Sequence, residues 1–186
     1  MEAGRLAATR EGPAVGGRRV VAGVSGGPGS LTALHRAADE ARLRGAELWA
    51  VLAWQTPGGG PAARGSCACA PYPEYRDAAA ARLRDAVVTA FGRGGPGVRM
   101  TAQIVRGTPR AVLVDAVRDA DDLLVVGAGR RGRPLGALWP SVARHCLAKA
   151  PCPVLVVPPN PLEAQLHTVR RRNAWHLPLD ARELAG

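Results

Sequence analysis

Aromatic residues, lysine and long apolar runs are all scarce in this chain of 186 residues. Aromatic side chains make up 4% of it, so alanine, valine and leucine must fill the core. No apolar run approaches the roughly 20 residues that cross a bilayer. Residues 1–17 lack the apolar core of a secretory signal and are expected to form a disordered leader. We therefore expect a cytoplasmic protein with one domain and no membrane segment.

Cysteine is also scarce, and its spacing fits neither a disulfide framework nor a zinc site. One residue, instead of two, separates Cys67 from Cys69. His145 stands beside Cys146 without a spaced partner, and Cys152 follows alone. We expect no metal site, and thiols that lie in a loop and on a half-buried helix.

The charge of the chain is one-sided, with a formal net charge of +10. Lys149 is the single lysine, and alanine, glycine, proline and arginine are all abundant, as a GC-rich coding sequence gives without selection for binding. Nucleic-acid binding through an arginine-rich loop and the tail arginines, Arg170–Arg172, is a further alternative. Trp175 is the only aromatic residue near those tail arginines, so little base stacking is available and we expect no nucleic-acid partner.

Five apolar runs of strand length alternate with stretches whose apolar residues recur every three or four positions. The runs are Arg19–Val24, Glu47–Trp54, Val98–Val105, Leu123–Val126 and Pro153–Val157. Runs that are apolar throughout are typical of parallel strands covered on both faces. The pattern predicts an α/β fold for residues 18–158, with one open, doubly wound, Rossmann-like parallel sheet and helices on both faces. Residues 159–186 form a basic C-terminal tail, in which Leu162–Val169 is the one candidate helix.

Capping residues and glycines place the four predicted helices between the strands. The first predicted helix has its N-cap at Ser30 and stops at Gly45, and the second ends near Gly92. The third starts at Thr108 and Pro109, and its apolar face continues through Val117 and Ala120. The fourth spans about Ser141 to Lys149.

The stretch Asp122–Ser141, DLLVVGAGRRGRPLGALWPS, leads from the fourth strand into a loop rich in glycine and arginine. Loops at the carboxyl ends of parallel strands form the ligand crevice of such sheets, and free backbone N–H groups there favour phosphate. Gly127–Gly132 matches GxGxxG, but a dinucleotide site has that motif after the first strand, with an acidic residue about 20 positions later. It also imitates a P-loop, yet Arg133–Pro134 stands where Lys-Ser/Thr is required. We therefore predict a phosphate-facing loop of another kind.

No residue set has the pattern of a catalytic site. Ser25 and Ser141 lack a nucleophile-elbow sequence, and His35 and His145 lie on helical patterns. The carboxylates fit polar helix faces (Asp39, Glu40, Asp77, Asp85, Asp115 and Asp119) or precede the fourth strand, at the end of the sheet opposite the crevice (Asp121 and Asp122). We expect no catalytic residue and no enzyme activity.

Three stretches carry a resemblance to a known family. They are RVVAGVSGGPGSLTAL with ARLRGAELWAVLAW, then VRGTPRAVLVDAVRDADDLLVVGAG, and finally PSVARHCLAKAPCPVLVVP. Through them the chain resembles the universal stress protein family from about Arg18 to Pro158. The resemblance implies a five-stranded parallel sheet of order 3-2-1-4-5, a switch point between strands one and four, a homodimer through the last strand (Pro153 to Val157), and a stress-response role with an unknown protein partner.

Nucleotide-binding members resembling this chain carry G-x2-G-x9-G-[ST] after strand four and an aspartate at the end of strand one. Gly127 and Ser141 match the first and last positions, whereas Arg130, Pro140 and Ser25 stand at the second glycine, the third glycine and the aspartate. Arginine limits positive φ and close phosphate approach, and proline removes an N–H group. Serine provides no charged acceptor for a ribose hydroxyl.

By the same resemblance, a nucleotide would have its phosphates near Gly127 and Ser141, and its base and ribose near Gly23 to Ser25 and Ala53. The candidate nucleotide-binding residues are Gly23, Val24, Ser25, Ala53, Gly127, Gly129, Arg130, Gly132, Ser141 and Val142. Arg130, Arg131 and Arg133, with a glycine turn shifted to Gly129 and Gly132, leave another anionic ligand open. We expect a regulatory module with a degenerate adenine-nucleotide crevice and no certain cofactor; the alternative is an ATP-binding nucleotide sensor.

Overall fold

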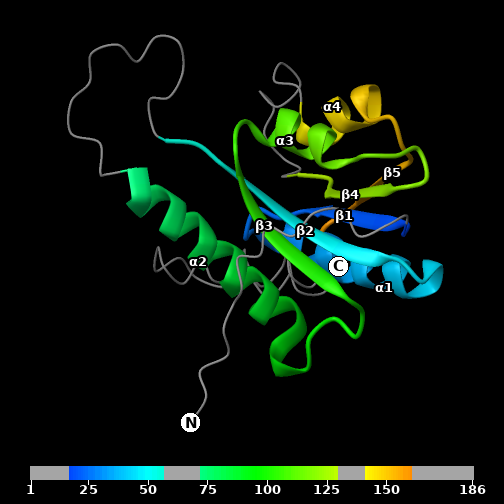
Figure 1. Ribbon diagram of the computed structural model, residues 1–186, viewed down its shortest axis with the longest axis horizontal. Coiled ribbons are helices and arrows are strands. Elements are labelled where there is room, and N and C mark those ends of the chain that lie inside the picture. The colour runs from blue at the N-terminus through cyan, green and yellow to red at the C-terminus, as the bar shows by residue number, and fades with distance from the viewer. Residues whose placement is uncertain (1–16, 57–71, 130–140, 161–186) are drawn as a thin grey trace, which may run out of the picture.

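A computed structural model of the chain describes residues 17–56, 72–129 and 141–160. Strands and helices alternate along these residues (Figure 1): β1 (Arg19–Gly23), α1 (Pro28–Arg44), β2 (Glu47–Trp54), α2 (Tyr72–Phe91), the short 3-10 helix η1 (Gly92–Gly94), β3 (Met100–Arg106), α3 (Pro109–Ala116), β4 (Leu123–Gly127), α4 (Val142–Lys149) and β5 (Val154–Val157). The strands form one sheet of order β3-β2-β1-β4-β5 in which every pair is parallel. The predicted doubly wound α/β fold and its strand order are confirmed.

The strands are apolar throughout because helices cover the two faces of the sheet. In Figure 1, α1 and α2 lie on one face, and α3 and α4 lie on the other. Successive strand residues alternate between the two cores: Val20 and Ala22 pack with α1 and α2, while Val21 packs with α3 and α4. Each of these three side chains is completely buried.

Helix α1 begins earlier than the sequence predicts. Its N-cap is Gly27 and Pro28 stands in its first turn, so Ser30 is not the N-cap. The Ser30 hydroxyl lies inside the first turn and donates to the Gly27 carbonyl at 2.8 Å. Proline suits this position because its missing N–H group would have no partner in the helix. The predicted stop at Gly45 is confirmed, since that glycine is left-handed at the C-cap.

Helix α3 ends earlier than the sequence predicts, and β3 starts later. Thr108 caps α3 as expected, but the helix stops at Ala116, so Asp119 and Ala120 lie in a turn and not on a helix. The cause is Asp122, whose carboxylate accepts from the backbone N–H groups of Arg118 and Asp119 at 3.0 and 3.4 Å. These bonds fix the chain as a turn that leads directly into β4.

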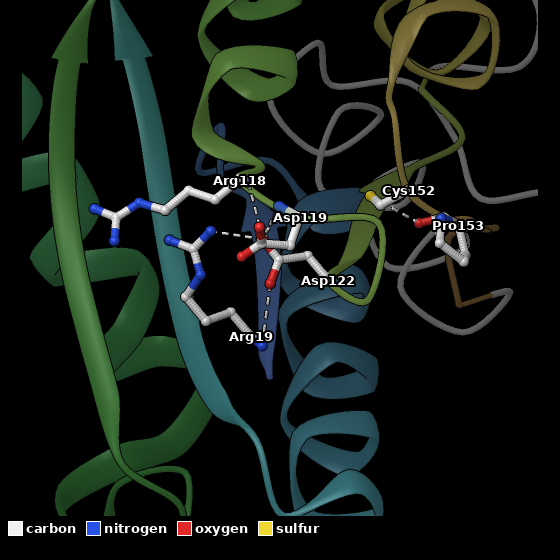
Figure 2. Close-up of polar contacts among 6 residues, drawn as sticks. All are labelled: Arg19, Arg118, Asp119, Asp122, Cys152 and Pro153. Carbon is white, nitrogen blue, oxygen red and sulfur yellow. Dashed lines mark hydrogen bonds and ion pairs between the residues drawn. The ribbon is translucent and has the colours of Figure 1, made fainter. Parts of the chain in front are cut away.

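A buried ion pair joins β1 to this turn at the amino end of the sheet (Figure 2). The Arg19 guanidinium lies 2.6 Å from a carboxylate oxygen of Asp122, and the two side chains are 8% and 2% exposed. The Arg19 backbone N–H also donates to Asp122, at 3.3 Å. Burial by itself raises the pKa of Asp122, but the N–H of Arg118, the Arg19 guanidinium and the N–H of Asp119 outweigh it and hold that pKa below its ordinary value.

Trp49 of β2 lies beside the ion pair. The guanidinium carbon of Arg19 is 5.0 Å from the centre of the Trp49 ring, and that of Arg118 is 5.6 Å from it. Within the described residues, Arg19 Nη1 and Trp49 Nε1 are buried without a hydrogen-bond partner. Contact between a guanidinium and an aromatic face stabilises the cation, so the indole offsets part of the cost of burying Arg19.

No helix within residues 17–56, 72–129 and 141–160 is long and apolar enough to cross a bilayer. Several sequence-based predictions lie outside the described residues: the leader before residue 17, the loop with Cys67 and Cys69, the segment from Arg130 to Pro140, and the tail with its candidate helix.

Candidate functional site

The connections from β1 and β4 leave the sheet in opposite directions. Strand β1 lies between β2 and β4, and its connection through α1 leads to β2. Strand β4 leads through α4 to β5 on the other side. In such sheets the ligand crevice lies at the carboxyl ends of the two strands where the direction changes. The structure therefore confirms the switch point between β1 and β4, and a ligand crevice at their carboxyl ends stays a prediction.

The loop after β1 presents backbone donors at the start of α1. The Val24 N–H continues the sheet by donating to the Val51 carbonyl at 2.8 Å. Beyond it, the N–H groups of Ser25, Gly26 and Gly27 donate no hydrogen bond to any described residue. Gly26 has φ +78°, a conformation that glycine adopts without strain. Free donors at the N-terminus of a helix favour an anion.

Ser25 stands at the end of β1, at the position where the nucleotide-binding motif has an aspartate. Its side chain is exposed and makes no hydrogen bond with a described residue. Its hydroxyl oxygen lies 3.7 Å from an ideal Cβ on Gly27. The end of β1 therefore presents a neutral hydroxyl group beside N–H groups that have no hydrogen-bond partner among the described residues.

Gly127 is required by packing, whether or not a ligand binds. A Cβ on Gly127 would lie 2.6 Å from the Gly29 carbonyl oxygen, in the first turn of α1. A neighbouring backbone atom at that distance cannot be avoided by a side-chain rotation, so any larger residue would push β4 and α1 apart. After it, the Ala128 N–H donates to the Val157 carbonyl at 2.8 Å, and Gly129 is exposed with φ +76°. Gly127 thus sets how closely the two sides of the crevice approach.

Ser141 caps α4, which begins on the other side of the crevice. Its hydroxyl oxygen accepts from the Arg144 N–H at 3.1 Å, and the side chain is exposed. The hydroxyl proton is not used in that bond, so Ser141 can still donate to a ligand. Val142 follows, half-buried against the core under α3 and α4.

Arg82 lies against the β1–α1 loop, a contact that the sequence did not reveal. It lies on α2 and is exposed, and its Cγ is 3.1 Å from an ideal Cβ on Gly26. On the sequence it is one of several arginines on a polar helix face. Only the packing of α2 beside the β1–α1 loop brings its aliphatic carbons close to Gly26.

The described loop residues at the carboxyl end of the sheet carry no charged side chain. They are residues 24–27, 55–56, 107–108, 128–129, 141 and 158–160, and they contain no aspartate, glutamate, lysine or arginine. The nearest acid on α2 is Glu74, in the first turn of that helix. The acids of the α3–β4 connection, which include Asp122, lie at the opposite end of the sheet, as expected. Within the described loops, this end of the sheet therefore offers backbone and hydroxyl groups and no carboxylate.

The structure places eight of the ten candidate residues at this end of the sheet. They are Gly23, Val24 and Ser25 after and within β1, Ala53 near the end of β2, Gly127 and Gly129 at the end of β4, and Ser141 and Val142 at the start of α4. Arg130 and Gly132 lie outside the described residues. Contact of these residues with a ligand stays a prediction.

Cys146 and Cys152 are buried, and neither belongs to the crevice. Burial raises the pKa of both thiols. The negative charge of Asp122 raises the pKa of Cys152 further, and the two thiols disfavour each other's ionisation. The Cys152 thiol donates to the Pro153 carbonyl at 3.3 Å (Figure 2). Among the described residues, no group of three or more histidine, cysteine, aspartate or glutamate side chains is arranged to hold a metal.

Comparison with known proteins gives one family. The sequence model of the universal stress protein family matches residues 17–158. A universal stress protein of Mycolicibacterium smegmatis is 30% identical over 140 residues, which make up 75% of this chain and 45% of that protein. The chain therefore spans less than half the length of this relative.

Two solved structures combine a similar fold with similar sequence. A universal stress protein in complex with cAMP is 25% identical, with a TM-score of 0.58 over 77% of this chain and 99% of that chain. The universal stress protein from Archaeoglobus fulgidus in complex with dAMP is 28% identical, with a TM-score of 0.52 over the same shares, 77% and 99%. This chain belongs to the universal stress protein family.

Proposed function

We propose that this universal stress protein is a cytoplasmic, non-enzymatic regulatory module of the stress response whose crevice is a degenerate adenine-nucleotide site. The observation that carries the proposal is the end of β1, where Ser25 presents a neutral hydroxyl to the crevice. A ribose hydroxyl placed there has no carboxylate to donate to, and charge-assisted hydrogen bonds are about twice as strong as neutral ones. Two relatives bind adenine nucleotides, as cAMP and dAMP complexes.

The absence of turnover is proposed from the chemistry of the crevice. General acid–base catalysis needs a group that exchanges protons near neutral pH within hydrogen-bond reach of the reacting atom. The described loops at the carboxyl end of the sheet offer hydroxyl and amide groups. His35, on α1, packs edge-on against Phe91 with the ring centres 5.5 Å apart, and His145 is half-buried on α4.

Titration calorimetry with ATP and Mg²⁺ tests the proposal. We expect the full chain to bind ATP more weakly than the micromolar range, and we expect Ser25→Asp combined with Arg130→Gly and Pro140→Gly to tighten binding. Ser25→Asn in the same background is the matched control, because it has the size of aspartate without its charge. Micromolar binding of ATP by the unaltered chain would refute the degenerate crevice and favour the second candidate, an ATP-responsive sensor, which the intact Gly127 and the Ser141 cap support.

A homodimer through β5 is part of the proposal. Among the described residues, β5 pairs with β4 alone and forms an edge of the sheet, and Val154, Leu155 and Val156 are half-buried. Leu147 of the adjacent α4 is 60% exposed. An exposed edge strand beside an apolar side chain suits pairing with a second copy.

Sedimentation velocity on two leucine variants tests the dimer. Leu147→Asp should convert it to monomer. Leu43→Asp, on the opposite face of the sheet, should leave it unchanged although Leu43 is 79% exposed. A dimer that survives Leu147→Asp would place the interface elsewhere.

A further inference from the structure

Two arginines lie against the ring of Trp49 at the amino end of the sheet, opposite the predicted crevice. The guanidinium carbon of Arg19, on β1, is 5.0 Å from the ring centre, and that of Arg118, in the turn after α3, is 5.6 Å from it. Figure 2 shows both side chains extending toward β2, the strand that carries Trp49. Three separate elements thus bring two cations and one indole together.

The charge of Arg118 is not neutralised within the described residues. Asp122, the buried carboxylate of this region, accepts four hydrogen bonds, which fill its acceptor sites. The Arg118 guanidinium makes no hydrogen bond or ion pair with a described residue. Glu47, on the same face of β2 as Trp49, accepts a hydrogen bond at 2.7 Å from the Thr101 hydroxyl instead. The two arginines and the one buried carboxylate therefore leave an excess of one positive charge.

Two buried donors beside Arg118 have no acceptor among the described residues. They are Arg19 Nη1, on a side chain that is 8% exposed, and Trp49 Nε1. Buried donors are nearly always paired in folded proteins, because an unpaired donor has lost its water without replacement. Arg118 is exposed, so its side chain can turn away from the ring without breaking a polar contact within the described residues. Its movement would open the ring and the donors beside it to a small ligand.

We propose that Arg19, Trp49 and Arg118 form a second ligand site, independent of the nucleotide crevice, and that it binds the carboxylate of a small organic acid. A carboxylate carries the single negative charge that balances the excess, and its two oxygens accept parallel hydrogen bonds from a guanidinium group. It is also planar, so it fits along the indole ring. A phosphate group is tetrahedral and carries close to two charges at neutral pH, so it matches this site less well.

Titration of the isotope-labelled full chain with sodium acetate, followed by NMR, tests the site. The indole N–H signal of Trp49, identified as the one that Trp49→Phe removes, should shift until it saturates. We expect a dissociation constant in the millimolar range, which suits so small a ligand. Sodium chloride at equal ionic strength should give no saturable shift, and inorganic phosphate should bind more weakly than acetate.

Two arginine variants locate the site. Arg118→Gln should weaken acetate binding about tenfold, because it removes one charged contact. It keeps the Arg118 backbone N–H that donates to Asp122, so the turn is retained. Arg84→Gln is the matched control: Arg84 is an exposed arginine of α2, on the other face of the sheet, and makes no ion pair with a described residue.

Each unexpected outcome counts against a stated part of the inference. A Trp49 signal that does not respond to acetate, or that responds equally to chloride, refutes the site. Phosphate binding as tight as that of acetate refutes the carboxylate as its ligand. Acetate affinity that is unchanged in Arg118→Gln, or that falls equally in Arg84→Gln, refutes the role of Arg118.

Discussion

Replacing Asp122 with asparagine should destabilise the protein far more than its small change in shape suggests. The carboxylate accepts four hydrogen bonds, two from Arg19, one from Arg118 and one from Asp119. An amide has one oxygen to accept them, and its NH₂ group would face further donors. The substitution also leaves the Arg19 guanidinium buried without a counter-charge.

The expected loss is about 3–5 kcal/mol, the cost of removing one partner from a buried pair. Asp39→Asn is the matched control, because Asp39 pairs with Arg42 at 2.8 Å but both side chains are 55% exposed. That loss should be at most about 1 kcal/mol. Urea unfolding at neutral pH, followed by circular dichroism, measures both values. The double variant Arg19→Met with Asp122→Asn should lose about 1–3 kcal/mol less than the sum of the single losses, because it removes both charges.

The stability that Asp122 contributes should be lost as the pH falls into the acid range. Its pKa in the folded protein is lowered, while in the unfolded chain it is about 3.9. A lowered pKa contributes stability that is fully present above the unfolded value and is lost as the pH falls through the folded value. The difference between the unaltered chain and Asp122→Asn should therefore be constant near neutral pH and shrink below about pH 4. Equal losses for Asp122→Asn and Asp39→Asn at neutral pH would refute the argument that burial decides the strength of these pairs.

Two further predictions concern packing and thiols. Gly127→Ala should lower the free energy of unfolding by about 1–3 kcal/mol, because the new Cβ would clash with the Gly29 carbonyl. Gly94→Ala is the control, since no atom lies within 4 Å of its new Cβ. An equal loss of stability in the two variants would contradict the packing argument. Once the other two cysteines are replaced by alanine, Cys146 and Cys152 should resist iodoacetamide at neutral pH until the protein unfolds, because burial raises the pKa of both thiols; fast labelling of the folded chain would show that they are accessible.

The sheet could be predicted from the sequence because its strands are buried on both faces. Runs such as Glu47–Trp54 are apolar at nearly every position, and a parallel sheet covered by helices is the structure that requires this. The boundaries of α1 and α3 were less predictable, since each depends on a contact outside the helix pattern. Ser30 is a residue type that commonly caps helices, but Pro28 allows α1 to begin earlier. Helix α3 ends at Ala116 because the carboxylate of Asp122, six positions later, binds the backbone N–H groups that follow the helix.

Contacts between distant parts of the chain could not be predicted from the sequence. Arg19 and Asp122 are 103 positions apart, and they meet because β1 and β4 are neighbours in the sheet. Arg82 reaches Gly26 because α2 packs on the same face as α1. Neither contact leaves a local pattern. The missing carboxylate at Ser25, in contrast, was visible from the family motif alone.

The charges at the helix N-termini give an independent reason to expect an anion in the crevice. Each helix that follows a strand starts at the carboxyl end of the sheet, where its N-terminus carries partial positive charge. An acidic residue in the first turn would compensate, but α1, α3 and α4 have none. Instead, Arg110 stands in the first turn of α3 and Arg144 in that of α4, each unfavourable by about 0.3–1 kcal/mol. Three helix N-termini have no acidic residue in their first turn, so we expect an external anion bound at this end of the sheet to stabilise the fold.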